Sequence, residues 1–187
     1  MSTPRVMRAD ARRNRDALVS RARALFETGD EQLRFDDFAA LSGVGVGTPY
    51  RHFPTREALA AAVYEQEVQT LTNLAAQLQQ APPEGGPLAE FLRRMVDHID
   101  HNQRLARRLS TLLSTMPAEM ADAAHDLEDA VAALVAQEIR SGTVRPDLDP
   151  GALMLVLHSI GAAQDRPQWR TEVDQVLTVL IDGMRPR

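Results

Sequence analysis

Apolar residues recur along most of the chain at the three- and four-residue spacing of an amphipathic helix. The first such stripe lies in a helix predicted from Ala11 to Thr28 and ended by Gly29, and consists of Leu18, Val19, Ala22, Leu25 and Phe26. Residues before about 10 are expected to be unstructured. No alternating strand pattern of useful length appears. The pattern therefore predicts an all-α protein of about nine helices.

The middle of the chain is predicted to form one long helix and three further ones. The long helix runs from Arg56 to about Leu78, and the segment APPEGGP at 81–87 breaks it. Three apolar stripes follow over residues 88–99, 105–116 and 120–139, and the last of them stops at Ser141 and Gly142.

Two helices are predicted at the C-terminal end. Asp149 and Pro150 are typical of a helix cap and first turn, and the segment 151–164 that follows is apolar on nearly every side, as in a helix buried all round. Pro167 is predicted to begin the final helix. A second subunit would most simply cover these two helices in a four-helix bundle. The predicted dimer interface consists of Leu157, Ile160, Gly161, Val173, Leu177 and Leu180.

Residues 35–59 have the spacing of a helix-turn-helix unit. A first short helix ends at Ser42 and Gly43, and a second runs from Gly45 to about Phe53, before Pro54. Thr55 is then a predicted cap for the long helix. Arg56 lies in that helix's first turn, where a cation opposes the helix dipole unless a phosphate lies beside it.

The second short helix carries groups suited to contact with a DNA backbone and base edges. Its hydrogen-bond donors are Thr48, Tyr50, Arg51 and His52, and its small apolar surfaces are Val46, Gly47 and Pro49. Alternatives from the residues alone are that Tyr50 and Phe53 are core aromatics and that Arg51 and His52 are ordinary surface residues.

The segment GVGVGTPYRHFPTREAL, with Ala-Leu-Phe and Gly29 upstream, resembles the helix-turn-helix signature of TetR-family transcriptional regulators over about residues 12–63. The resemblance implies phosphate contacts from Thr48, Tyr50, His52 and Arg56 and base contacts from residues 46–50. It also implies a dimer. Leu33 and Arg34 stand where the family usually has Thr or Ser, so that phosphate contact is expected to pass to Arg34. Pro49 replaces a usual Leu.

The predicted domains are a DNA-binding domain over residues 1–55, with a basic N-terminal arm, and an effector-binding and dimerisation domain over residues 56–187. Charge agrees with this division. Residues 1–60 carry ten Arg against eight Asp and Glu, or +2, whereas residues 61–187 carry eleven against eighteen, or -7. The overall charge of -5 therefore conceals one end suited to nucleic acid.

The middle helices are predicted to surround a cavity for a small, mostly apolar effector. Its lining would consist of Phe91, Met95, His98, Leu113, Met116 and Met120, with His98 as the polar group. The alternative is that these residues close into a solid core.

The cluster Asp97-His98-Ile99-Asp100-His101 resembles part of a metal site, but no further ligand set accompanies it, so we expect no metal, cofactor or catalytic residue. The chain has no cysteine and no apolar run of about 18 residues, which is what a membrane span requires. A cytoplasmic, homodimeric repressor that binds duplex DNA at a palindromic operator and is released by an effector is therefore expected. The alternative is a helical small-molecule-binding or metal-dependent protein without DNA binding.

Overall fold

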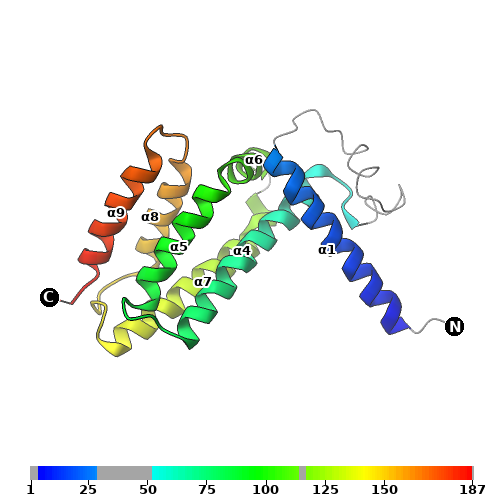
Figure 1. Ribbon diagram of the computed structural model, residues 1–187. Helices are drawn as coiled ribbons and strands as arrows, with labels where there is room; N and C mark the ends of the chain where they lie inside the picture. The colour runs from blue at the N-terminus through cyan, green and yellow to red at the C-terminus, as the bar shows by residue number, and fades with distance from the viewer. Residues whose placement is uncertain (1–3, 29–51, 114–116, 187) are drawn as a thin grey trace. The chain divides into compact units, whose positions relative to one another are not determined.

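The computed structural model describes residues 4–28, 52–113 and 117–186, with the backbone alone for 4–12, 110, 112–113 and 117–120. These residues form seven α-helices and no strand (Figure 1). The helices are α1 (Pro4–Thr28), α4 (Arg56–Gln80), α5 (Pro87–His101), α6 (Gln103–Leu113), α7 (Pro117–Ser141), α8 (Pro150–Ala162) and α9 (Trp169–Gly183). The all-α prediction is confirmed for this part of the chain. The predicted helices of the helix-turn-helix lie almost wholly outside the described residues.

Local capping chemistry sets several helix ends where the sequence predicts them. The hydroxyl of Thr55 accepts the backbone N–H of Ala58 at 3.1 Å, at the start of α4. The Asp149 carboxylate accepts the backbone N–H groups of Gly151 and Ala152, both at 3.2 Å, at the start of α8. Gly142 follows α7 with a φ of 74°, a conformation that favours glycine.

Two helix starts differ from the prediction. α1 begins at Pro4 rather than near Ala11, so the prediction of an unstructured start is wrong for the residues from Pro4 onward. Proline suits the first turn of a helix because its missing N–H has no partner there, and Arg and Ala continue a helix well. α9 begins at Trp169 rather than at Pro167. The backbone N–H groups of Arg166 and Trp169 close turns onto Ala163 and Arg166, and these turns contain the proline.

The described chain divides into two compact units. Unit 1 comprises Met1–Gln66 and Arg104–Met120, and unit 2 comprises Glu67–Gln103 and Ala121–Arg187. The helix α4 thus contributes its beginning to unit 1 and its remainder to unit 2. These units are defined by packing, so the predicted functional division after residue 55 stays a prediction.

Unit 1 has its own hydrophobic core, built from α1, the beginning of α4, and α6. Buried side chains from α1 meet Phe53 and the alanine-rich first turns of α4. The core members are Leu18, Val19, Ala22, Phe26, Phe53, Leu59, Ala60, Ala61, Ala62, Val63, Leu105 and Leu109. Burial of apolar surface of this kind is the main favourable term in folding, so α6 is part of this unit's core although it lies far along the sequence.

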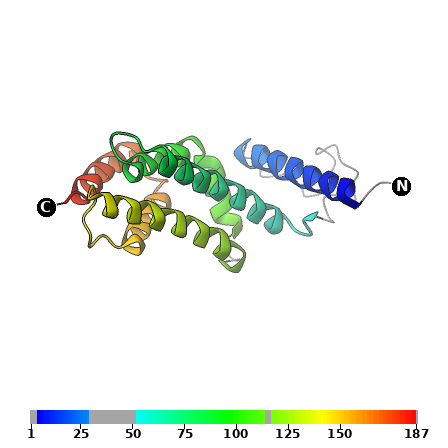
Figure 2. The ribbon, with the colours of Figure 1, turned by 90° about the horizontal axis from the view of Figure 1, so that it is seen from below.

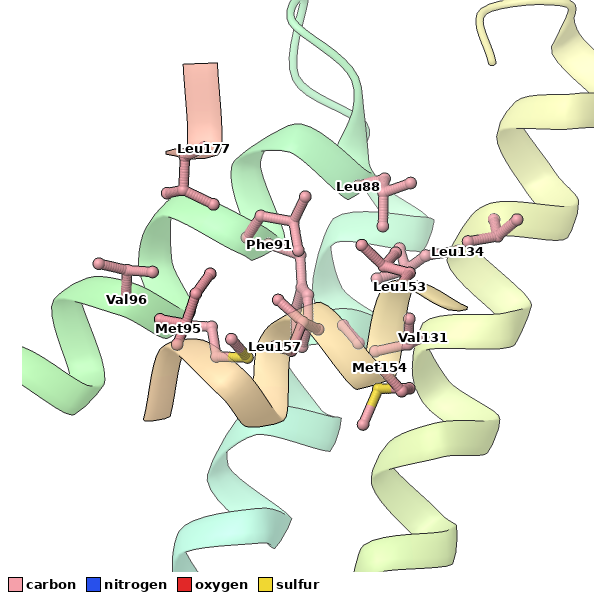
Figure 3. Close-up of a cluster of buried hydrophobic side chains, with 14 of the residues drawn as sticks. Leu88, Phe91, Met95, Val96, Val131, Leu134, Leu153, Met154, Leu157 and Leu177 are labelled. Carbon is pink, nitrogen blue, oxygen red and sulfur yellow. The ribbon is translucent and has the colours of Figure 1, made fainter. Parts of the chain in front are cut away.

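The core of unit 2 joins α4, α5, α7, α8 and α9. In Figure 3 the labelled side chains from α5, α7, α8 and α9 converge on Phe91, which is fully buried. The unit 2 parts of α4 and α7 run side by side in both views (Figures 1 and 2), and Gln137 Nε2 of α7 donates to the Gln79 carbonyl of α4 at 3.2 Å. Trp169 closes the core at α9, and its indole N–H donates to the Ile160 carbonyl at 2.8 Å. None of the seven described helices combines the length and apolarity that crossing a bilayer requires.

Candidate DNA-binding and effector sites

Only two of the predicted DNA-binding residues, His52 and Arg56, lie within the described part of the chain. Both side chains are half-buried. The others lie outside the described residues, and their roles stay predictions: Arg34, Val46, Gly47, Thr48, Pro49, Tyr50 and Arg51. The described edge of the predicted DNA-binding site is therefore the start of α4.

Arg56 occupies the first position of α4, immediately after its Thr55 cap. Its guanidinium carbon lies 5.9 Å from the centre of the Phe26 ring of α1, within range of a cation–π contact. Burial and the positive charge of Arg108 lower the pKa of Arg56, while Glu57 acts in the opposite direction. The cation is thus held at a positive helix end beside a second arginine, an arrangement that an anion would stabilise.

Phe53 is buried in the core of unit 1, as the alternative reading of that residue expected. The guanidinium carbon of Arg15 lies 5.4 Å from the centre of its ring, and Arg15 Nη2 lies 3.4 Å from Glu65 Oε2. Sequence reasoning did not single out Arg15. The excess of arginine in residues 1–23, seven against two Asp, was the available signal, but it did not distinguish one arginine from another.

The predicted effector residues on α5 fall into two environments. Phe91 and Met95 are buried in the packed core of unit 2 (Figure 3). His98, one turn further on, lines a groove of about 550 Å³ whose walls are residues of α4 and the end of α5. The side chains of Leu113, Met116 and Met120 lie outside the described residues. A cavity shared by all six therefore stays a prediction.

His98 is held by two polar partners. Its Nε2 lies 2.8 Å from Glu67 Oε2, and the His98 and Glu67 side chains are only 23% and 12% exposed. The Asn102 amide nitrogen lies 3.5 Å from His98 Nδ1 and also donates to the His98 carbonyl at 2.7 Å. This network assigns the proton to Nε2, which donates to the carboxylate, and leaves Nδ1 as the acceptor. Neither Glu67 nor Asn102 was identified as a partner from the sequence. Glu67 lies on a different helix, 31 residues before His98.

The acidic residues of the 97–101 segment form ion pairs. Arg170 of α9 donates to Asp97 Oδ1 at 2.6 Å, and its Nη1 also lies 3.7 Å from Asp100 Oδ2. The hydrogen bonds to Asp97 and Asp174 raise the pKa of Arg170 further, against a small opposing effect of burial. Among the described residues no three potential ligands are close enough to hold a metal ion. In this part of the chain the cluster therefore joins α5 to α9.

Most of the predicted dimer residues belong to the core of their own chain. Leu157, Ile160, Val173 and Leu177 are buried in unit 2, whereas Gly161 and Leu180 are partly exposed. The large apolar side chains that these two helices leave exposed are instead Leu155 at 69%, Val176 at 44% and Val179 at 74%. An apolar surface is therefore available on α8 and α9, and its most exposed members are residues that the prediction did not name.

Comparison with protein families gives a match over the C-terminal part of the chain. The profile described as "Transcriptional regulator SbtR-like, C-terminal domain", a TetR-type C-terminal domain, matches residues 82–186. That range includes α5 to α9.

Individual relatives match over almost the full length. The HTH-type transcriptional repressor LfrR of Mycolicibacterium smegmatis is 28% identical over 193 residues, covering 98% of this chain and 97% of the relative. A TetR transcription regulatory protein of Mycobacterium vanbaalenii is 32% identical, with 96% and 99% of the two chains covered and a TM-score of 0.66. The TetR transcriptional regulator SCO0520 of Streptomyces coelicolor is 28% identical, with 92% and 98% covered and a TM-score of 0.69.

Proposed function

This chain belongs to the TetR family of transcriptional regulators, and from that premise we propose that it represses transcription as a homodimer on a palindromic operator and is released by a small effector. The family membership supports a DNA-binding regulator over the alternative of a helical binding protein without DNA binding. The name of the LfrR relative describes that protein as a repressor, and this supports repression here.

The observation that carries the DNA contact is the environment of Arg56. Its guanidinium is half-buried at the N-terminus of α4, beside Phe26 and near Arg108. A DNA phosphate at this position would meet the guanidinium together with the positive end of the helix dipole. We infer that Arg56, with Thr48, Tyr50 and His52, contacts the DNA backbone, that Arg34 supplies a further phosphate contact, and that residues 46–50 contact the bases.

Arg56→Gln is expected to weaken operator binding about tenfold, because a charge-assisted hydrogen bond to phosphate is lost. The slope of log affinity against log salt concentration should fall by about one, the signature of one lost phosphate contact. Fluorescence anisotropy with duplex DNA from the region flanking the coding sequence, at several salt concentrations, measures both quantities.

The matched control for this measurement is Arg145→Gln. Arg145 is paired with Asp147 in unit 2, and its replacement should leave both the affinity and the salt slope unchanged. Wild-type affinity with an unchanged slope in Arg56→Gln would contradict the proposed contact.

The proposed dimer interface uses the exposed apolar residues of α8 and α9, Leu155, Val176 and Val179, and keeps the two predicted residues that are partly exposed, Gly161 and Leu180. Pairing of these two helices with their symmetry mates would form a four-helix bundle. Two DNA-binding units in one dimer would then reach half-sites roughly 34 to 36 Å apart or a multiple of that distance. A palindromic operator follows from this symmetry.

Leu155→Arg is expected to give folded monomers that no longer bind the operator, because an exposed apolar contact is replaced by a charge that must be buried in the dimer. Sedimentation velocity at micromolar concentration, together with operator binding, tests this. A variant that sediments as the wild-type dimer would remove Leu155 from the interface, and a monomeric wild type would refute the dimer.

Effector release would work through a shift in populations. The dimer would have one conformation that matches the operator spacing and one that does not. A ligand that binds the second conformation more tightly lowers operator affinity, and the size of the effect is limited by the difference in its affinity for the two conformations. We retain the predicted apolar cavity around Phe91, Met95, His98, Leu113, Met116 and Met120 as one candidate for its site.

A further inference from the structure

The groove lined by residues of α4 and α5 lies wholly within unit 2. Its volume of about 550 Å³ falls inside the range of about 300–1,000 Å³ found for small-molecule sites. Six of its lining residues decide what it can bind: Leu71, Asn73, Leu74, Arg94, His98 and His101.

Three hydrogen-bond acceptors of the groove already have donors. Asp97 Oδ1 accepts from Arg170 at 2.6 Å, and the Asp97 carbonyl lies 2.7 Å from His101 Nδ1. The Asn73 side-chain oxygen accepts from the Gln69 amide at 3.1 Å. These three atoms are therefore less available to donors on a ligand.

Donors, in contrast, remain available. The Nε of Arg94 donates to Glu90 at 2.7 Å, and within the described parts of the chain its two terminal amino groups have no other partner. The Asn73 amide nitrogen likewise has no hydrogen bond to a described residue. A guanidinium with two terminal amino groups matches the two oxygens of a carboxylate.

The apolar part of the groove comes from α4. Leu71 and Leu74, about one turn apart on α4, both line it. The hydrogen bond between His98 and Glu67, at 2.8 Å, joins the α5 wall to α4. The two walls are thus tied together in the absence of a ligand, which reduces the ordering that binding would require.

We propose that this groove binds a small amphipathic carboxylate. The carboxylate contacts Arg94 and the Asn73 amide, and the apolar body lies along Leu71 and Leu74. An effector role for this groove rests on the proposed function, in which Arg56 at the start of α4 contacts DNA. Binding of the carboxylate itself does not depend on the proposed function.

Octanoate is a suitable probe, and octanamide is its uncharged counterpart of nearly the same shape. Titration of the full-length protein at constant ionic strength, followed by amide chemical shifts and calorimetry, should show saturable binding of octanoate and none of octanamide. Arg94→Gln should weaken octanoate binding about tenfold or more, the effect of losing a charge-assisted contact.

Arg93→Gln is the matched control. Arg93 is the neighbouring residue on α5 and is also exposed. It lines two other surface pockets and not this groove. Its replacement should leave octanoate affinity within about twofold of wild type, since only a screened surface charge is removed.

Three results would overturn the proposal. Absence of saturable octanoate binding would exclude the ligand class. Equal binding of octanamide would favour an apolar cavity instead, and an equal loss in Arg93→Gln would show that general charge, not the groove, attracts the anion.

Operator binding by the ligand-free wild type, measured on the same preparation, separates the two proposals. Failure of specific DNA binding would refute the proposed function and leave the carboxylate site standing. Octanoate that binds but does not change operator affinity would refute the effector role alone.

Discussion

Leu157→Arg is expected to abolish cooperative folding of unit 2 rather than to yield folded monomers. Leu157 is buried in the core formed by α4, α5, α7, α8 and α9, close to Phe91 (Figure 3). A guanidinium without a partner in such a place belongs to the class of substitutions that cost more than about 4–5 kcal/mol, and whole domains are stable by only about 5–15 kcal/mol. Thermal unfolding followed by circular dichroism should lose its sharp transition.

Leu155→Arg provides the comparison for this experiment, since it makes the same chemical change two residues earlier on α8. Leu155 is 69% exposed, so its variant should unfold cooperatively even where the dimer is lost. If Leu157→Arg instead unfolds as sharply as Leu155→Arg, with a midpoint within a few degrees of it, the assignment of Leu157 to the core is wrong.

Gly86→Ala should destabilise the chain by roughly 3 kcal/mol or more, from two separate effects. Gly86 is the N-cap of α5 and has a φ of 87° and a ψ of 143°, close to a region that is almost restricted to glycine and that costs a residue with a Cβ about 1–3 kcal/mol. An added Cβ would also lie 2.1 Å from Glu138 Oε1. Since the buried Glu138 carboxylate accepts the Leu88 backbone N–H, its displacement would add the loss of a charge-assisted bond, about 1.5–3 kcal/mol. Urea unfolding measures the sum.

Two other glycines separate these effects. Gly142 has a φ of 74° but no atom within 4 Å of an added Cβ, so Gly142→Ala should show the conformational cost alone. Gly85→Ala should cost little, because the nearest atom would be a terminal nitrogen of the flexible Arg93 side chain, 4.0 Å away. A loss in Gly86→Ala no larger than that in Gly142→Ala would contradict the steric role of Glu138.

The helix positions that sequence reasoning predicted well are those set by neighbouring residues. Thr55 and Asp149 cap helices because their side-chain oxygens reach backbone N–H groups two or three residues ahead. The start of α9 was misplaced because Pro167 is as compatible with a turn as with a first helical position. The turn is chosen here by backbone hydrogen bonds around Arg166 and by the burial of Trp169.

The apolar residues of α8 show a different limit. Leu155 and Leu157 are equally apolar in the sequence, yet one is exposed and the other is buried. A helix that is apolar on nearly every side has no polar face to mark its orientation. Only the packing of α5, α7 and α9 against it decides which leucine belongs to the core, so the apolar pattern alone could not separate core residues from those available to a partner.

Side-chain partners across helices were the least predictable part of the candidate sites. His98 stood out as a polar residue beside an apolar stripe, but Glu67, its partner, precedes it by 31 residues on another helix. The groove depends on such pairs, on Arg170 engaging Asp97 and on Gln69 engaging Asn73. Periodicity reports which face a residue occupies and carries no information on which of its polar atoms remain available.

The buried carboxylate of Glu138 has a consequence for the behaviour of the protein in acid. Burial raises the pKa of Glu138, and the hydrogen bond from the Leu88 N–H offsets this only in part. The contribution of Glu138 to folding stability is therefore complete below the pKa of the unfolded state. It is lost as the pH rises through the pKa of the folded state. Glu172 is the opposite case, because its hydrogen bond with Arg166 lowers the pKa of Glu172. Its contribution is present above the unfolded pKa and is lost as the pH falls through the folded one. The two glutamates therefore act in opposite directions, because a fall in pH favours the folded state through Glu138 and disfavours it through Glu172.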